Sequence, residues 1–441
     1  MHSRLSRWSR YAFLAGIVLA LVLVIPTQWF PFQLSKVAAF SVALLLSTVL
    51  FIVAGGARDM LRSHGLLAAL MVGLLPLSYL VSALFVRGNG VSMTGFGIET
   101  DTVVFVTLSA LCYLLSFALF KTLRTARMLS MVVFWSLAAA VIFQLVSIVF
   151  GDMAIPLSAF ADRSVNLIGK WNDLGLLAAL LSVLLFAGVE LGTASNLKRI
   201  GAGVGGVALV GLLGLINFSL AWVLFLAGCV LLGLLTLLRQ RADHRAEPGS
   251  TVSAAAMVPW YPMVGVIVAI IFLLYGSAIN TGLISVFPVS SLEVRPGLQS
   301  TLDIAGQARA DSLRVLLFGT GPNTFGASWL AYKPLEVNRT PFWNLDFNVG
   351  YSTLATAFSS AGFLGALAWF IPLMLLVAAV VRAVRLNVLS REERFVASVL
   401  GLSSFFLLAT IALYVPSQNI ILLAFALSGA AFGFLWRQGR A

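Results

Sequence analysis

The amino-acid sequence predicts an all-α polytopic membrane protein with about twelve transmembrane helices. Of its 441 residues, 60% are hydrophobic and only 10% are charged, and the mean hydropathy is +1.01. Soluble domains do not have this balance, whereas long apolar runs are typical of membrane helices. One long polar stretch interrupts the pattern late in the chain. We therefore expect a single integral membrane domain over residues 1–441, with one large extracytoplasmic loop at 288–351.

Apolar runs of spanning length follow one another along the whole chain. They occur at about 11–30, 37–54, 66–86, 103–120, 128–150, 174–193, 200–216, 218–238, 259–287, 356–381, 395–414 and 420–436. Each approaches or exceeds the roughly 17–25 residues that cross the hydrocarbon core. Only a tight turn near Asn217 and Ser219 separates 200–216 from 218–238, so this pair is either two spans or a broken or re-entrant segment.

The N-terminus has some features of a signal peptide. Arg4, Arg7 and Arg10 precede its apolar run, but that run is long and continues into PTQWFPF without a small-residue cleavage site. Signal peptides have a short apolar region followed by such a site. We therefore expect a retained first helix.

The distribution of Lys and Arg predicts the orientation. Most of the 28 Lys and Arg residues map to one face of the topology and are spread over its short connections. An excess of these residues marks cytoplasmic connections, so we expect both termini in the cytoplasm and the large loop outside. The net charge of +12 then needs no nucleic-acid partner. The other cations are expected outside, where they either bind a ligand or pair with Asp and Glu; they are Lys36, Arg87, Arg163, Lys170, Arg295, Arg309, Arg314, Lys333 and Arg339.

The polar stretch from Pro288 to Tyr351 is the expected functional element. Loops this long are usually functional or disordered, and its Trp, Phe and Tyr content argues against disorder. Apolar and polar residues alternate with a helical period, which predicts an amphipathic helix lying at the outer membrane–water boundary. The apolar set is Leu298, Leu302, Ala305, Leu313, Leu316 and Leu317, and the polar set is Asp303, Gln307 and Asp311.

Gly319-Thr320-Gly321-Pro322-Asn323 is expected to end this helix with a turn. A nucleotide-binding loop is rejected, because no strand precedes the glycines and no Gly-Lys-Ser/Thr follows them. Gly319 and Gly321 either shape a turn against the membrane or bind phosphate through their amides, and we favour the turn.

His, Cys and metal chemistry find little support. Cys112 and Cys229 lie in apolar runs, where buried thiols that fill space are expected rather than a disulfide or a metal pair. All three histidines, His2, His64 and His244, map to the cytoplasmic side, which excludes an outer Ser-His-Asp arrangement. The outer acids lack the paired spacing of a metal site, so we expect no metal; they are Glu293, Asp303, Asp311, Glu336 and Asp346.

Guanidinium groups and aromatic rings remain as candidate ligand-binding groups. Arg presents paired donors to phosphate oxygens, and Trp and Tyr offer faces that stack on sugars. An anionic lipid headgroup such as a diphosphate-linked glycan suits both kinds of side chain. Ordinary lipid anchoring at the interface explains much of the same composition.

Four features resemble the O-antigen ligase and O-antigen polymerase family of bacterial integral membrane glycosyltransferases. The first is an outer loop that ends IGKWNDLGLLAALL, from Ile168 to Leu181. The second is an Arg some two dozen residues before a Gly-X-Gly-Pro-X-X-Phe, here Arg295 and then Gly319, Gly321, Pro322 and Phe325. The third is the position of these residues on one large loop late in the chain. The fourth is a Gly-X-X-Gly, Gly362 and Gly365, that opens the next helix. The resemblance covers roughly residues 150–380.

The resemblance implies a lipid-dependent, GT-C-like glycosyltransferase architecture. Members transfer a glycan from an undecaprenyl diphosphate carrier to a glycan, lipid or protein acceptor at the outer face of the bacterial cytoplasmic (inner) membrane. They use no nucleotide sugar, metal or other cofactor. In that picture outer Arg residues hold the diphosphate leaving group. Arg163 and Arg295 match best by loop position, and Arg309 and Arg339 are further candidates.

One departure from the family concerns the general base. Ligases of this family place His followed by Asn about eleven residues before the glycine that opens the next helix, and counting back from Gly362 gives Tyr351 and then Ser352. Asp346, Glu336 or Tyr351 could act instead, or the chain is polymerase-like, or it has lost transfer activity. An ordinary Tyr is protonated near neutral pH and is a poor base, so we favour Asp346.

These observations lead to a hypothesis and two rivals. The hypothesis is a cell-envelope ligase or polymerase that uses a polyprenyl-diphosphate glycan donor, with Arg residues stabilising the diphosphate charge. The first rival is a non-catalytic binding protein or transporter for lipid-linked glycans, and the second is a structural scaffold. A transporter is expected to carry polar or charged residues near the bilayer midplane. The predicted helices are nearly free of them, and Glu190 falls near a cytoplasmic end.

Overall fold

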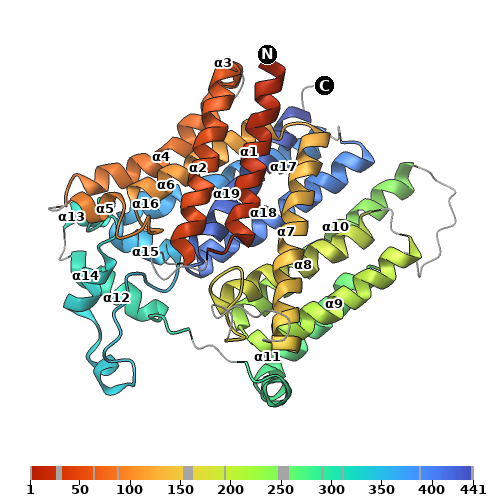
Figure 1. The fold of residues 1–441 in the computed structure, drawn as a ribbon. Coiled ribbons are helices and arrows are strands. Elements are labelled where there is room, and N and C mark those ends of the chain that lie inside the picture. Colours follow the sequence, from red (N-terminus) through yellow and green to blue (C-terminus); the bar gives the residue numbers. More distant parts are fainter. Residues whose placement is uncertain are drawn as a thin grey trace. The chain divides into compact units, whose positions relative to one another are not determined.

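All regular structure in the computed structural model is helical over the residues that it describes. These residues are 2–25, 32–62, 65–86, 89–151, 162–192, 195–246, 258–289, 293–309, 312–386 and 389–438. Along the chain (Figure 1) they form α1 (His2–Val22), α2 (Phe32–Val53), α3 (Gly56–Arg62), α4 (Gly65–Ala83), α5 (Asn89–Met93), α6 (Val103–Leu119), α7 (Leu123–Phe150), α8 (Trp171–Glu190), α9 (Asn196–Ile216), α10 (Ser219–Ala246), α11 (Trp260–Val286), α12 (Leu298–Arg309), α13 (Leu313–Phe318), α14 (Phe325–Tyr332), the 3-10 helix η4 (Leu335–Arg339), α15 (Thr353–Ser360), α16 (Gly362–Ala368), α17 (Ile371–Leu386), α18 (Arg391–Leu413) and α19 (Gln418–Gln438).

The apolar helices confirm a multi-pass membrane protein. Within the described part of the chain, 11 helices are long and apolar enough to cross a membrane. α6 is also apolar, and its 17 residues reach the lower limit for a span. Together they account for the twelve predicted runs, with α16 and α17 forming one span from Gly362 to Leu386.

Two details of the predicted runs are corrected or resolved by the structure. The apolar run drawn from 356 includes the end of α15, and its span begins at Gly362, the glycine that was predicted to open this helix. A positive φ of 71° at Gly362 separates α15 from α16. The uncertain pair at 200–238 forms two helices of spanning length, α9 and α10. Asn217 ends α9 in the left-handed conformation, with φ 49°, which reverses the chain within two residues.

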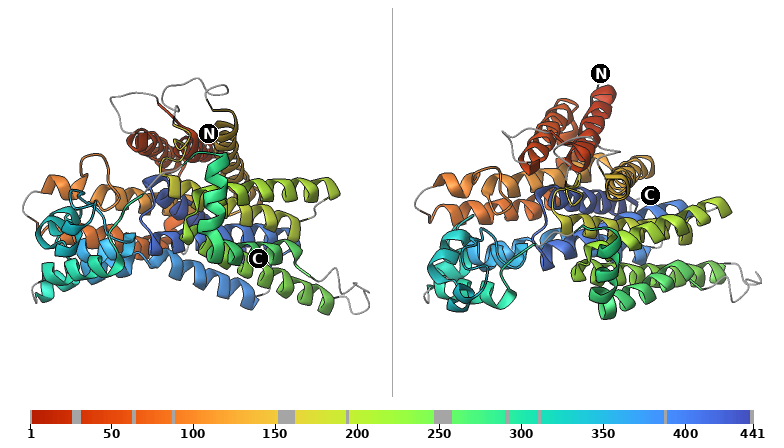
Figure 2. Two further views of the ribbon diagram at one scale, coloured as in Figure 1. Left: turned by 90° about the horizontal axis from the view of Figure 1, so that it is seen from below. Right: turned by 60° about the horizontal axis from the view of Figure 1, so that its bottom comes forward.

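The chain divides into two compact units. Unit 1 holds residues 1–129, 294–389 and 407–441, and unit 2 holds residues 130–293 and 390–406. Unit 1 therefore contains α1 to α6, the helices of the large loop, α15 to α17 and α19, whereas unit 2 contains α8 to α11 and most of α7. In both views of Figure 2 the loop helices α12 to α14 lie beside α15 and α16, with which they share unit 1.

The centre of unit 1 is the contact between α6 and α19. A Cβ on Gly429 would overlap the carbonyl oxygen of Tyr113, and one on Gly433 would overlap that of Phe117, so only glycine allows the two backbones to lie this close. The Cys112 thiol donates to the Leu422 carbonyl oxygen at 3.5 Å. Both Cys112 and Cys229 are buried and free, which confirms that they fill space rather than pair.

Contacts within unit 1 join helix ends in two separate groups. In the first group Lys36, at the start of α2, donates to the Leu21 carbonyl oxygen near the end of α1 at 3.2 Å. The Asn419 amide donates to the Ala20 carbonyl oxygen at 3.3 Å, which adds the start of α19 to this group. In the second group the Ser9 hydroxyl donates to the Ser47 carbonyl oxygen at 2.8 Å, joining the start of α1 to the end of α2. α1 and α2 are therefore antiparallel, and α19 begins at the same end of the pair as α2.

Candidate functional site

The large loop folds into four short helices. The single amphipathic helix predicted from Leu298 to Leu317 is wrong, because the structure has two helices, α12 and α13. Ser312 begins a new helix there: its extended backbone ends the preceding segment and its hydroxyl accepts from the amide of Val315 at 3.4 Å. Asp311, one of the predicted polar residues, lies outside the described residues.

These short helices enclose a small core of their own. Ile304, Phe325 and Trp329 are fully buried, and Phe347 packs against them. The Trp329 and Phe347 rings meet edge to face with centroids 4.8 Å apart, a favourable geometry for aromatic pairs. The Trp329 indole N–H also donates to the Leu345 carbonyl oxygen at 3.3 Å. The described part of the loop therefore has a packed aromatic core, and the aromatic content that argued against disorder supplies it.

The two faces of α12 have different environments. Thr301, Ile304 and Ala305 are buried against the rest of the loop. Leu298 and Leu302, which belong to the predicted apolar face, are instead exposed. Both side chains are accessible to lipid. The position of α12 at the membrane boundary remains a prediction.

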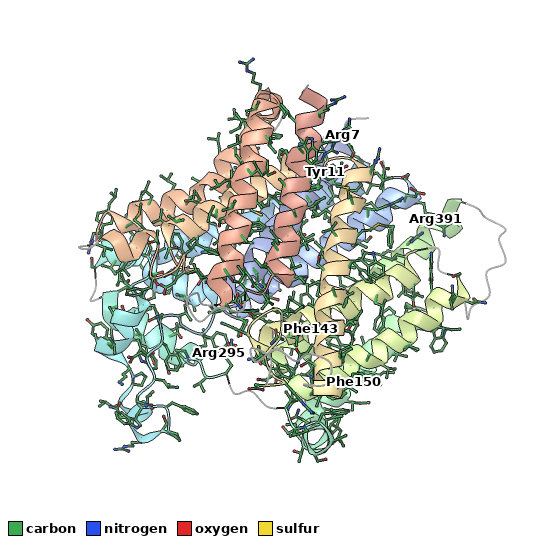
Figure 3. All side chains as sticks on the ribbon, in the orientation of Figure 1. Arg7, Tyr11, Phe143, Phe150, Arg295 and Arg391 are labelled. Atoms are coloured by element: carbon green, nitrogen blue, oxygen red, sulfur yellow. The ribbon has the colours of Figure 1, made fainter. Side chains whose placement is uncertain are left out.

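Arg295 lies at the start of the loop (Figure 3). Its guanidinium contacts two tyrosine rings. Its guanidinium carbon is 4.7 Å from the ring centroid of Tyr351 and 4.9 Å from that of Tyr414, within cation–π range of both. One N–H of the guanidinium donates to the Tyr351 carbonyl oxygen at 3.2 Å. Arg295 and Tyr351 are half-buried, whereas Tyr414 is fully buried. The structure thus brings together two of the residues selected from the sequence.

The backbone around Tyr351 is fixed from both sides. Its amide donates to the Thr301 hydroxyl at 3.0 Å, and the amide of Gly350 donates to the Thr356 hydroxyl at 2.9 Å. The Thr353 amide donates to the Tyr414 carbonyl oxygen at 3.1 Å. α12, α15 and the end of α18 therefore set the position of the Arg295 side chain.

The glycine turn after α13 is docked on the junction between α15 and α16. Gly319 and Gly321 have positive φ, and a Cβ at Gly319 would overlap the Ser360 carbonyl oxygen. The Gly319 amide donates to the Val315 carbonyl oxygen at 2.8 Å, and the Gly321 amide donates to the Ser360 carbonyl oxygen at 2.7 Å. Both amides have protein partners, which confirms that these glycines shape a turn and do not offer a phosphate site.

Sequence analysis missed Asp101, a buried carboxylate beneath this turn. It is 4% exposed. It accepts hydrogen bonds from the Tyr79 hydroxyl and the Ser360 hydroxyl, each at 2.9 Å, and from the Asn323 amide at 3.0 Å. The Trp369 indole N–H donates to the Tyr79 hydroxyl oxygen at 3.1 Å. Through these hydrogen bonds Asp101, just before α6, joins α4, α15 and the glycine turn.

Burial also perturbs the titration of this carboxyl. It raises the pKa of Asp101 from 3.8 to about 6, and the hydrogen bonds from Ser360, Asn323 and Tyr79 oppose the rise. Glu99, which contacts the Asn323 side chain, raises it further. The sequence signal for this residue is a second acid, two residues after Glu99, that directly precedes Thr102 and an apolar run.

The other predicted loop residues either have different contacts or are exposed. The Arg309 guanidinium carbon is 4.8 Å from the Phe358 ring centroid, and its Nε donates to the Ala305 carbonyl oxygen at 3.1 Å. Arg339, Glu336 and Asp346 are exposed. Their roles as ligand or base remain predictions.

Arg163 belongs to unit 2 and is tied to the end of α7. Its guanidinium donates to the Ile148 carbonyl oxygen at 3.3 Å, and its own carbonyl oxygen accepts from the Gln144 amide at 2.7 Å. Asn166 holds the following turn together, because its side-chain oxygen accepts from the amides of Ile168 and Gly169 at 2.9 Å each. Arg163 thus hydrogen-bonds to a carbonyl in the last turn of α7, where the helix dipole favours a cation.

Two further sequence observations can be placed. Glu190, at the end of α8, accepts from the Tyr261 amide in the first turn of α11 at 3.1 Å, so it caps a helix. Among the described residues, no group of three or more His, Cys, Asp and Glu is arranged to hold a metal ion.

Comparison with known proteins adds no assignment, because no protein-family model and no curated protein sequence matches the chain.

Proposed function

We propose that this protein is a cell-envelope glycosyltransferase. It takes a glycan from a polyprenyl-diphosphate carrier and transfers it to a glycan, lipid or protein acceptor at the outer face of a bacterial cytoplasmic membrane, as an O-antigen ligase or polymerase does. The observation that carries the proposal is the Arg295 guanidinium held between Tyr351 and Tyr414. Asp346, Tyr351, Arg163, Arg309 and Arg339 remain its other candidate site residues.

The chemistry of Arg295 suits a diphosphate. A guanidinium keeps its charge when it is partly buried and carries five N–H donors in a planar fork that matches phosphate oxygens. The two rings contact the cation and limit its rotation, so less conformational entropy is lost when a ligand binds. A fixed cation next to the leaving group stabilises the charge that develops as the glycosidic bond breaks.

The number of spans gives the side of the loop relative to the N-terminus. α1, α2, α4 and α6 to α11 precede the loop, which is an odd number of crossings if each helix crosses once. The loop then lies on the side opposite to the N-terminus, and the positive-inside rule assigns both termini to the cytoplasm. Arg295 follows the ninth span, α11, in the chain. We therefore expect it to be within reach of a diphosphate anchored in the outer leaflet.

The positions of buried charges favour chemistry at the surface over transport. Lys36 lies near the start of α2, Asp101 just before α6, and Asp173 near the start of α8. By the same alternation all three helix starts are on the outer side. A transport path for a charged ligand would instead require ionisable groups near the bilayer midplane.

A transfer assay tests the proposal. The full-length protein is reconstituted in vesicles with a synthetic polyprenyl-diphosphate oligosaccharide and a mixture of lipid, glycan and peptide acceptors, with a chelator present. We expect glycan-bearing acceptor and free polyprenyl diphosphate to accumulate together at a rate that the chelator leaves unchanged. Donor binding without transfer would support the binding-protein rival, and transfer that is abolished by chelator and restored by a divalent ion would contradict the proposal.

A further inference from the structure

Exposed apolar side chains gather where α4 ends, on and after α5, and at the start of α13. Phe96 is 90% exposed, Leu84 73% and Leu313 67%. Phe85, Val91 and Met93 are exposed too. α4 contacts both α5 and α13, and all of these residues belong to unit 1. A water-exposed loop rarely concentrates so many apolar side chains without a partner for them.

This surface continues the exposed apolar side of a span. α4 is long and apolar enough to cross the membrane and ends at Ala83. Leu77 and Leu80 are exposed along it, and Leu84 and Phe85 extend the same apolar surface by about one helical turn. Residues one turn beyond the end of a span lie at the depth of the lipid headgroups. Continuity with the span therefore favours lipid as the occupant over another protein.

One exposed cation lies against this surface. The Arg314 guanidinium carbon is 5.1 Å from the ring centroid of Phe85, and the Phe85 ring packs against Phe318 with centroids 5.5 Å apart. Arg314 is exposed, so its charged end is accessible. Interfacial Arg side chains commonly keep their stems on apolar surface while the guanidinium reaches the phosphate layer.

We propose that Leu84, Phe85, Val91, Met93, Phe96 and Leu313 form a lipid-binding surface, on which Arg314 binds the phosphate of an anionic phospholipid of the outer leaflet. The apolar side chains contact the upper part of the acyl chains. Arg matches phosphate oxygens through paired donors, and the Phe85 ring sets the direction of the guanidinium. This inference does not depend on the proposed transferase activity.

The apolar part is tested by fluorescence quenching. Phe96→Cys carries an environment-sensitive fluorophore in the full-length protein, reconstituted in vesicles of phosphatidylcholine and phosphatidylglycerol. Thr340→Cys, an exposed position in the same loop, is the matched control. We expect lipids with a spin label near the carbonyl end of the acyl chain to remove most of the emission at position 96 and little at 340. Unquenched emission at position 96 would overturn the proposal, because it would mean that water or protein covers the surface.

The phosphate part is tested by lipid retention. Native mass spectrometry compares retained phosphatidylglycerol with phosphatidylcholine of the same chains, for Arg314→Gln and for Lys333→Gln as a control that removes another cation of the same loop. We expect Arg314→Gln to lower phosphatidylglycerol retention about fivefold, the usual contribution of one interfacial Arg, and Lys333→Gln to leave it unchanged. Equal retention by the wild type and Arg314→Gln would overturn the assignment of Arg314.

Discussion

The guanidinium of Arg295 donates to the carbonyl oxygen of Tyr351 and lies over the ring of the same residue. These residues lie near the two ends of the large loop, so their contact joins the beginning of the loop to its end. Counting back from Gly362, Tyr351 falls where the resemblance drawn from the sequence would place the His of a ligase. Arg295 therefore contributes to the structure of the loop in addition to its proposed role at the diphosphate, and tests of Arg295 must separate the two.

The topology predicts which engineered thiols can be reached from outside. A Cys at Thr340 should react with a membrane-impermeant maleimide in intact cells, because this residue is exposed on the large loop. A Cys at Ser195, exposed between α8 and α9, should react only after lysis. Ser328 is a poor probe because it is buried. Labelling at 195 but not at 340 in intact cells would show the opposite orientation and would contradict the proposed transfer at the outer face.

Asp101 should make stability depend on pH. Its folded pKa of about 6 lies above its ordinary value of 3.8, so the folded protein binds more protons than the unfolded chain between these values. Stability should therefore fall as the pH rises through this window, by about 3 kcal/mol for a shift of this size. Thermal unfolding of the wild type and Asp101→Asn between pH 4 and 7 measures this effect.

The difference between the two Asp101 curves is the informative quantity, because other groups titrate in the same window. Asp101→Asn should lack the decline that the wild type shows. It should also lose at least one of the three hydrogen bonds, since an amide offers one acceptor oxygen in place of two. Parallel stability curves for the two proteins would contradict the assignment of the shift to Asp101.

Asp346 and Tyr351 can be distinguished as candidate bases. Asp346→Asn should leave donor binding intact and lower transfer by about 10²–10⁴, the usual effect of losing a general base. Tyr351→Phe keeps the ring beside Arg295 and removes only the hydroxyl, so it should retain both binding and transfer. Single-turnover transfer and donor binding are measured on both variants. Normal transfer by Asp346→Asn together with loss in Tyr351→Phe would assign the base to Tyr351.

The spans could be predicted from sequence because each depends on a local property. Runs such as 259–287 and 420–436 correspond closely to α11 and α19, since apolar length alone decides whether a helix can cross. The glycine turn was also predictable, because Gly319 and Gly321 adopt backbone angles that favour glycine. Gly362 was selected from the sequence as the glycine that opens the next helix, and α16 does begin there. Its close packing against the glycine turn could not be predicted, because that contact joins separate segments of the chain.

The candidate site was less accessible to sequence reasoning because its contacts join distant segments. Arg295 could be selected by its loop position, but its contact with Tyr414 requires the end of α18 to approach the loop. Asp101 and Asn323 are 222 residues apart in the chain, and the sequence around either residue does not predict their hydrogen bond. Charge patterns indicated which residue types matter, and tertiary packing decided which of them meet.

Donor binding by Arg295 variants tests the central claim most directly. The full-length protein, Arg295→Ala and Arg295→Lys are compared for retention of polyprenyl-diphosphate oligosaccharide and for glycan transfer, after thermal unfolding has shown that each is folded. Arg385→Ala is the control, because it removes an exposed cation from the last turn of α17, outside the large loop. A charged hydrogen bond contributes roughly 1.5–3 kcal/mol, so Arg295→Ala should weaken donor retention about ten- to a hundredfold and slow transfer. Arg295→Lys should recover part of the binding through its charge. Folded Arg295→Ala that retains and transfers the donor like the wild type would contradict the claim.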